Sequence, residues 1–330
     1  MPRVDYVCPD THRRLVATDL GLLRDDGKIY PFLNGHAELA HPAPNFLDVV
    51  AAGDGSRASL AMYNTEAATA TYRNFLDWLF ATFRQDEGSF RRMLVGRLRP
   101  SAGDRVLVTG CGLGDDIPAI LEAIGPDGEV QAQDISQTMV QEAAECWRRE
   151  RPDQARQVYF STGDALRLPF ADDAFDAAFH FGGINLFDDI GKGIEEMNRV
   201  VRPGGRVAIS DEGVGPWLRN TEYGRMVITN NRLWAHPAPI DHLPPTVADV
   251  AVTWVLGNCF WIIDFTVTDA LPAIDARVPH KGWRGGSMWT RHLGQLEGVT
   301  PETRAKVQEA AAAAGLSVHD WLETVLGEHL

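Results

Sequence analysis

A glycine-rich turn carries the first residues whose types and spacing point to chemistry. An apolar stretch, residues 106–109, runs directly into Gly110, Gly112 and Gly114. A turn this tight needs glycine because some positions require positive φ and because a ligand must approach the bare backbone closely. The pattern predicts a cofactor site where a strand passes into a helix.

The spacing of these glycines separates two kinds of cofactor. Dinucleotide-binding turns carry G-x-x-G in their second half, which seats a pyrophosphate on the helix N-terminus. Here the third glycine comes one residue early, and Asp115 and Asp116 follow it at the helix start. Two carboxylates would repel a pyrophosphate but not the positive sulfonium and ammonium of S-adenosylmethionine (SAM). The sequence therefore favours SAM over NAD.

Two further aspartates end predicted strands. Asp134 lies 20 residues beyond Gly114, where a carboxylate holds ribose hydroxyls in this architecture. The alternative for Asp134 is a helix N-terminal charge ahead of Ser136. Asp164 follows the third strand, where it can accept from an adenine amino group or form an Asx turn.

Residues for the methyl acceptor are expected beyond the carboxyl ends of the strands, where ligands bind in such sheets. Acid–base candidates are His180, Glu212 and Tyr63, and acceptor-binding candidates are Asn185, Trp234, His236, Arg284 and Arg291. The alternatives are a cofactor contact for His180, a solvated loop charge for Glu212 and hairpin surface charges for the basic stretch 280–292. Methyl transfer needs alignment and at most one proton removal, so the sequence does not specify the acceptor.

Short apolar runs alternate with helical patterns from Arg105 onward, which is typical of parallel β-α units with right-handed crossovers. Strands are predicted at Arg105 to Thr109, Glu129 to Asp134, Gln157 to Thr162, Ala174 to Phe181 and Arg206 to Ser210. Helices are predicted at Asp116 to Ile124, Ser136 to Arg149 and Lys192 to Val201. We predict a doubly wound, mostly parallel seven-stranded α/β sheet with a helical lid and a small N-terminal β module.

The chain divides into four predicted segments. Residues 1–45 form the β module, 56–212 the cofactor-binding core with its leading helices, and 213–256 a lid or substrate insertion. Residues 257–330 are expected to complete the core with antiparallel strands, Cys259 to Thr268 and Ser287 to Glu297, followed by C-terminal helices.

Charge and hydropathy exclude several classes of partner. The 31 basic and 45 acidic side chains give a net charge of -14, which disfavours nucleic acid. No apolar run reaches the roughly 18 residues of a membrane-spanning helix, and the N-terminus lacks a signal-peptide core. We expect a cytoplasmic protein without a membrane partner, whose four scattered cysteines stay reduced.

Five motifs in order resemble those of class I SAM-dependent methyltransferases, closest to the ubiquinone and menaquinone C-methyltransferases. They are Gly110 to Gly114, Asp134 to Ser136, Gly163 to Phe170, Phe175-Asp176 and Arg202 to Gly205. The resemblance implies that the three glycines pass under the methionine part of SAM and that Asp134 binds the ribose. It also implies that Ile135 and Met139 flank the adenine, that Asp164 and Ala165 meet its edge, and that Phe181 and Gly182 lie near the sulfonium.

One position departs from that family pattern. Its members often carry an acidic residue two positions before the first glycine, and this chain has Val108 there. The contact to the methionine ammonium would then come from His180 or from a backbone carbonyl.

The N-terminal segment resembles the zinc ribbons found ahead of some rRNA guanine methyltransferases, but its ligands do not carry over. Thr11 stands where a second cysteine would be, which leaves Cys8 with His12. Zinc needs about four N or S ligands, so we expect no metal. The module would instead serve packing, homodimer formation or cover of the active site.

The leading hypothesis is a methyltransferase that acts on carbon or oxygen of a small-molecule acceptor, with secondary metabolism as a candidate setting. An rRNA or tRNA base methyltransferase is the first alternative, motivated by the N-terminal module. A non-catalytic SAM-binding protein is the second, motivated by Val108.

Overall fold

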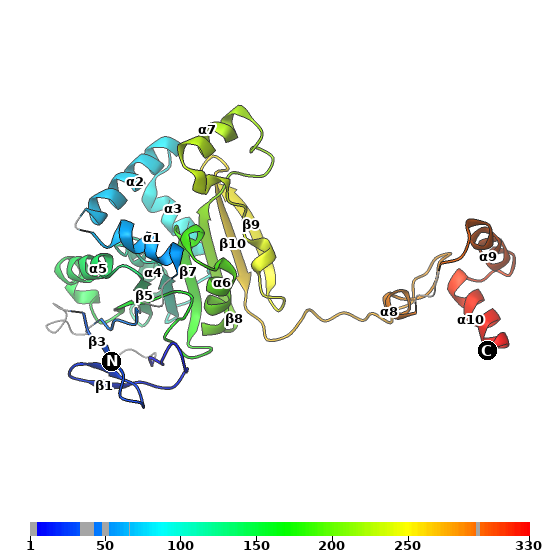
Figure 1. Cartoon of the computed structure of the whole chain (residues 1–330), viewed down its shortest axis with the longest axis horizontal. Helices are drawn as coiled ribbons and strands as arrows, with labels where there is room; N and C mark the ends of the chain where they lie inside the picture. Colours follow the sequence, from blue (N-terminus) through cyan, green and yellow to red (C-terminus); the bar gives the residue numbers. More distant parts are fainter. Residues whose placement is uncertain (1–4, 34–42, 48–52, 66, 295–297) are drawn as a thin grey trace. The chain divides into compact units, whose positions relative to one another are not determined.

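The computed structural model describes residues 5–33, 43–47, 53–65, 67–294 and 298–330 (Figure 1). They fall into two compact units, Met1–Leu271 and Pro272–Leu330. The first unit holds the predicted cofactor site, and each unit is described by itself.

A seven-stranded sheet in the order β6-β5-β4-β7-β8-β10-β9 forms the centre of the first unit. Its strands are β4 (Arg105–Thr109), β5 (Glu129–Asp134), β6 (Val158–Thr162), β7 (Phe175–Phe181), β8 (Val201–Glu212), β9 (Ala248–Val255) and β10 (Phe260–Thr266). Strands β4 to β8 pair in parallel, and β10 is antiparallel to both β8 and β9. The strand order reverses between β4 and β7, where ligands bind in open α/β sheets.

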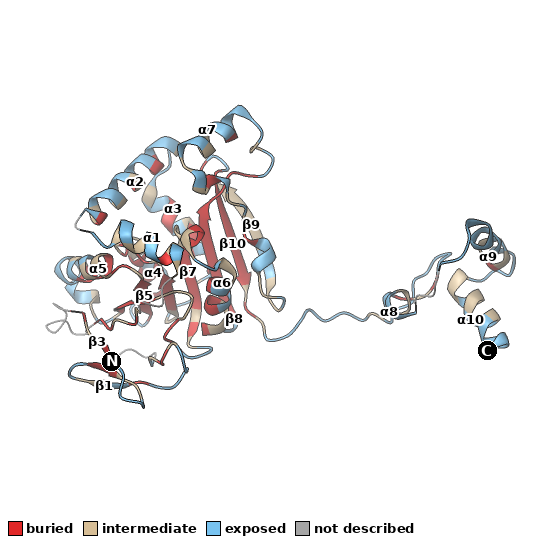
Figure 2. Cartoon of the chain, viewed as in Figure 1, coloured by how far each residue is buried: buried red, intermediate tan, exposed pale blue. Residues whose placement is uncertain are grey.

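Helices cover both faces of this sheet, as expected for a doubly wound fold. They are α1 (Asp54–Tyr63), α2 (Ala68–Phe83), α3 (Glu87–Gly96), α4 (Ile117–Ile124), α5 (Gln137–Glu150), α6 (Ile190–Val200) and α7 (Glu222–Asn230). One buried core cluster joins α2 to α5 with β4 side chains such as Val106, and another joins α6 with Leu107 and Ile209 (Figure 2). Successive strand residues face opposite sides, so Val106 and Leu107 enter different clusters.

The N-terminal residues form a three-stranded antiparallel sheet of β1 (Val16–Thr18), β2 (Gly21–Leu23) and β3 (Ile29–Pro31). Residues 43–47 continue from it along the sheet edge: Phe46 N donates to Thr162 O at 2.7 Å, and Thr162 N donates to Pro44 O at 3.0 Å. The module therefore belongs to the first unit and extends its sheet beside β6.

The predicted strands and helices of the core agree with the structure to within two residues, except at β8. This strand begins at Val201, where Val201 pairs with Phe175, rather than at Arg206, because the Pro203-Gly204-Gly205 turn interrupts the register without ending the pairing. Strand β9 lies inside residues 213–256, which the sequence assigned to a lid. That segment thus contains both a helix, α7, and the edge strand of the sheet, β9.

The prediction of a strand from Ser287 to Glu297 is wrong. A helix, α8 (Met288–Leu293), begins there because Ser287 and Thr290 form a reciprocal capping box. Helices α9 (Pro301–Ala313) and α10 (Val318–His329) share the second unit with α8. The expectation that the C-terminal helices complete the core stays a prediction, because these helices belong to the second unit.

Candidate functional site

The glycine turn after β4 has the backbone geometry that its sequence requires. Gly110, Gly112 and Gly114 all have positive φ, at 61°, 52° and 79°. A Cβ at Gly110 would lie 2.9 Å from the His180 ring, and one at Gly112 would lie 3.5 Å from the Tyr72 ring. Any side chain at Gly110 would therefore displace a neighbour, and the bare backbone faces the pocket.

Asp134 closes this turn from the neighbouring strand. Its Oδ2 accepts from Gly112 N at 2.8 Å and its Oδ1 accepts from Ser136 N at 2.8 Å. Burial raises the pKa of Asp134, although these backbone N–H groups oppose the rise. Each oxygen keeps a lone pair, so the carboxylate can still accept from two hydroxyls. Asp134 therefore makes the helix-start contact that was its alternative role, and its carboxylate can still bind a ligand.

A pocket opens at the carboxyl ends of the strands and brings together most of the predicted site. The predicted residues that line it are Tyr63, Gly110, Gly112, Asp134, Ile135, Met139, Asp164, Ala165, His180, Phe181, Gly182 and Glu212. Gly114 is not among the lining residues, because its Cα faces the Ile117 side chain. The pocket thus joins the expected cofactor residues to the expected acid–base residues.

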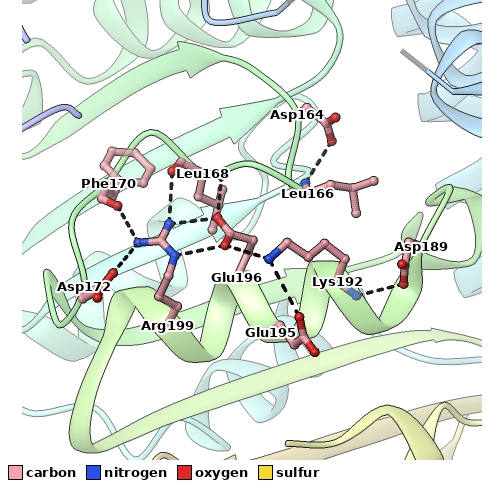
Figure 3. Close-up of polar contacts among 10 residues, drawn as sticks. All are labelled: Asp164, Leu166, Leu168, Phe170, Asp172, Asp189, Lys192, Glu195, Glu196 and Arg199. Atoms are coloured by element: carbon pink, nitrogen blue, oxygen red, sulfur yellow. Dashed lines mark hydrogen bonds and ion pairs between the residues drawn. The ribbon is translucent and has the colours of Figure 1, made fainter. Parts of the chain in front are cut away.

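Asp164 reaches the pocket from a loop that α6 holds in place (Figure 3). Its Oδ1 accepts from Leu166 N at 2.9 Å, which is the Asx turn named as its alternative. Farther along the loop, Arg199 donates to the carbonyls of Phe170 and Leu168, at 2.8 and 3.2 Å. Glu196 pairs with Arg199 at 2.8 Å. Burial alone would raise the pKa of Glu196, but the Arg199 guanidinium outweighs it and lowers this pKa.

His180 is fully buried at the end of β7 and presents one free nitrogen. Its Nδ1 lies 2.9 Å from the carbonyl oxygen of Thr109, so Nδ1 carries the proton and donates. Among the described residues, Nε2 has no hydrogen-bond partner. Burial lowers the pKa of His180, although the nearby Asp211 carboxylate opposes this. The ring is therefore neutral near pH 7 and offers an acceptor lone pair.

Glu212 and Asp211 end β8 beside His180. Asp211 accepts from the N–H groups of Gly183, Asn185 and Glu212, at 3.1, 2.7 and 2.8 Å. Burial, followed by the adjacent Asp211 charge, raises the pKa of Glu212 well above its usual value. Glu212 is thus a buried carboxyl group that lines the pocket and favours its protonated form, rather than a solvated loop charge.

Asn185 lies behind this pair of carboxyl groups. Its Nδ2 donates to the Glu212 carbonyl at 2.8 Å, and within the described ranges its buried Oδ1 has no partner. Asn185 therefore contacts the backbone of Glu212 but does not itself line the pocket.

The structure does not bring Trp234 or His236 to the pocket. Trp234 is fully buried in the core, with its ring 5.2 Å from that of Phe260, and the pocket-lining residue of that turn is instead Leu233. The His236 side chain does not line the pocket either. Arg284 and Arg291 belong to the second unit.

Two residues near the glycine turn, Tyr72 and Arg91, were not predicted from the sequence. Tyr72 from α2 lines the pocket beside Gly112. Arg91 from α3 is buried, pairs with Asp116 at 2.6 Å and lies over the Phe181 ring at 5.3 Å. Only a helical spacing of apolar residues marked these helices in the sequence, and it gave no sign of a buried cation.

The ion pair of Arg91 removes the charge difference that favoured SAM over NAD in the sequence. Asp116 is paired with Arg91, and Asp115 is paired with Arg73 at 2.8 Å. These carboxylates are therefore neutralised by arginines at the start of α4. Their charge no longer distinguishes SAM from NAD, and the glycine spacing alone retains that argument.

The described residues contain no group of three or more His, Cys, Asp or Glu side chains that could hold a metal ion. Their helices also include none that is long and apolar enough to cross a membrane. The zinc-ribbon resemblance of the N-terminal module remains a prediction.

The fold and this pocket define a Rossmann-like methyltransferase architecture. Residues 106–205 match the family model described as a methyltransferase domain. Phosphoethanolamine N-methyltransferase 2 of Haemonchus contortus, solved with S-adenosyl-L-methionine, is similar in fold, with a TM-score of 0.52 and 16% identity. That similarity covers 69% of this chain and 62% of the other.

Curated relatives share the same region. The 2-phytyl-1,4-naphtoquinone methyltransferase of Synechococcus elongatus is 37% identical over 122 residues, which is 37% of this chain and 52% of that protein. The 27-O-demethylrifamycin SV methyltransferase of Amycolatopsis mediterranei is 31% identical over 173 residues, or 52% of this chain and 60% of that protein. The matches thus span roughly half of each relative's length.

Proposed function

We propose that this chain is a SAM-dependent methyltransferase that transfers a methyl group to carbon or oxygen of a small-molecule acceptor. The observation that carries the proposal is the single pocket in which the Gly110–Gly112 turn and Asp134 meet His180 and Glu212. The names of the relatives, which include quinone and rifamycin methyltransferases, support the same class of reaction.

The pocket residues fit the cofactor. The bare backbone at Gly110 and Gly112 leaves room for the methionine part, and a Cβ at Gly110 would lie only 2.9 Å from the His180 ring. Asp134 would hold the ribose hydroxyls, Ile135 and Met139 would flank the adenine, and Phe181 would lie near the sulfonium. When bound, the cofactor supplies a methyl group on a good leaving group.

His180 is the residue best placed to move a proton. His180 lines the pocket, and the Thr109 carbonyl fixes its ring through Nδ1. An acceptor hydroxyl that reaches Nε2 would pass its proton to the ring and keep the electron pair on its oxygen. The Asp211 carboxylate favours the imidazolium that this step creates.

The lining of the pocket restricts the charge of the acceptor. Among the described residues it includes no lysine or arginine, but it includes the carboxyl groups of Asp134, Asp164 and Glu212. Aromatic rings from Phe75, Phe187 and Phe260 complete the wall. This composition favours a neutral, largely apolar acceptor that donates a hydrogen bond, and it disfavours a carboxylate or diphosphate.

Calorimetry with S-adenosylhomocysteine (SAH) tests the cofactor site directly. We expect saturable binding at one site per chain, and absence of heat with both SAM and SAH would refute the proposal. The transfer activity is then tested by SAH release with neutral phenols, including reduced naphthoquinones, against matched aromatic carboxylates. Release with the carboxylates alone would contradict the acceptor class.

A further inference from the structure

The second unit contains a basic stretch. Residues 276–294 include Arg277, Lys281, Arg284 and Arg291 but no acidic residue. The whole chain carries a net charge of -14, so this stretch locally reverses the sign of the charge.

The stretch is a folded loop with a fixed backbone. Three backbone hydrogen bonds close it: His280 N to Gly286 O (2.6 Å), Trp289 N to Ala276 O (2.9 Å) and Val318 N to Trp283 O (2.8 Å). The third joins the tip of the loop to the start of α10, so the loop is held as part of the second unit. Its side chains are thus displayed from a defined scaffold.

Large apolar side chains of this loop remain exposed within the unit. Trp283 is 61% exposed, Val278 58%, Met288 51% and Trp289 46%. A folded unit that leaves several such side chains in contact with water offers a binding surface.

The cations stand among these apolar side chains. Arg277 lies over the Trp289 ring at 5.0 Å, and Lys281 and Arg284 flank the exposed Trp283. Within the described part of the chain, no carboxylate forms an ion pair with Arg277, Lys281 or Arg284. Their charge is therefore available to an anionic partner.

We propose that the loop of residues 276–294 docks this protein on an anionic lipid surface. Tryptophan rings are favoured at the boundary between head groups and acyl chains, and aliphatic side chains such as Val278 and Met288 can enter that boundary. Lysine and arginine beside them attract anionic head groups, each with about a fivefold gain in affinity near a charged surface.

A lipid surface explains the loop better than RNA does. RNA would use the cations and the two tryptophans, but it offers nothing to the exposed Val278 and Met288. The aliphatic side chains therefore decide between the two partners.

Co-sedimentation of the full chain with vesicles tests this proposal. We expect binding to phosphatidylcholine vesicles that contain phosphatidylglycerol, weaker binding at high salt, and little binding to phosphatidylcholine alone. The double variant Lys281→Gln/Arg284→Gln should lower the affinity by roughly 25-fold, from about fivefold per cation. Trp283→Ala should also weaken binding, and wild-type tryptophan fluorescence should shift to the blue on binding.

Arg304→Gln/Lys306→Gln on α9 is the matched control, because it removes the same charge from the same unit outside the loop. This control should bind as the wild type does, and an equal loss would reduce the effect to net charge and overturn the proposal. Absence of sedimentation with phosphatidylglycerol would also overturn it. Tighter binding to poly-uridine than to the vesicles would overturn it as well, because this result assigns the loop to RNA. A dimer that Trp283→Ala dissociates would assign the loop to a second copy of the chain, and would also overturn it. SAH binding should be the same in every variant, so this test is separate from that of the methyltransferase function.

Discussion

The Nδ1 atom of His180 lies 2.9 Å from the carbonyl oxygen of Thr109, the residue that stands directly opposite it in the parallel pairing of β4 and β7. This hydrogen bond places the proton on Nδ1 and leaves Nε2 as the acceptor. The register of two strands thus selects the tautomer of His180, the residue that we propose as the base.

Replacement of His180 tests its role as that base. His180→Gln should lower the turnover number by about 10² to 10⁴-fold, the usual contribution of a positioned base, while SAH affinity changes little. His236→Gln is the matched control outside the pocket and should retain full activity. A parallel loss of SAH affinity in His180→Gln would instead make His180 a cofactor contact, which is its alternative assignment.

The lowered pKa of His180 also predicts a pH dependence of stability. Unfolded histidine titrates near pH 6.5. Below that pH, His180 binds a proton in the unfolded chain, but it stays neutral in the folded chain until its lower folded pKa is reached. The free energy of unfolding should therefore fall as the pH drops from 6.5 toward the folded pKa. Urea titrations should show a shallower fall for His180→Gln, and identical slopes would contradict the burial argument.

Glu212 predicts the opposite dependence. Because its folded pKa is raised, its stabilising effect is complete below the unfolded pKa near 4.3 and is lost as the pH rises toward the folded pKa. Glu212→Gln should therefore gain stability relative to the wild type as the pH is raised from 5 to 8, as measured by denaturant unfolding. The exposed Glu122→Gln gives the reference slope, and a constant difference between Glu212→Gln and the wild type would show that Glu212 is ionised.

Asp134 is the most direct test of the cofactor site. Asp134→Ala should weaken SAH binding by roughly 1 to 3 kcal/mol, the cost of lost hydrogen bonds to a charged group. Calorimetry measures this change, with the exposed Asp127→Ala as the control. Unchanged affinity in Asp134→Ala would mean that the ribose lies elsewhere.

Arg91 should contribute strongly to stability through its buried ion pair with Asp116. Arg91→Met leaves Asp116 buried without a partner, which costs about 3 to 5 kcal/mol when one member of a buried ion pair is removed. The adjacent but exposed Arg92→Met should cost far less in thermal unfolding. Adding Asp116→Asn should restore part of the stability lost in Arg91→Met. If it does not, the pair is not the source of the loss.

The sequence by itself determined the centre of the fold and the glycine turn with the carboxylate that closes it. Positive φ at Gly110 and Gly112, and a carboxylate at the end of the next strand, are local requirements that residue types and spacing express directly. The strands β4 and β5 were predicted with their observed ends, because buried parallel strands appear as short apolar runs bounded by turn residues.

Tertiary structure alone decided the opposite wall of the pocket. The unpartnered Nε2 of His180 and the raised pKa of Glu212 depend on burial and on neighbours far away in the chain, and Arg91 reaches Asp116 from 25 residues away. Trp234 illustrates the reverse, since an aromatic residue in an irregular segment is equally suited to a pocket or a core, and packing placed it in the core. Local pattern specifies which backbone can form, but the long-range contacts of the folded chain determine which side chains share a cavity and what charge they carry there.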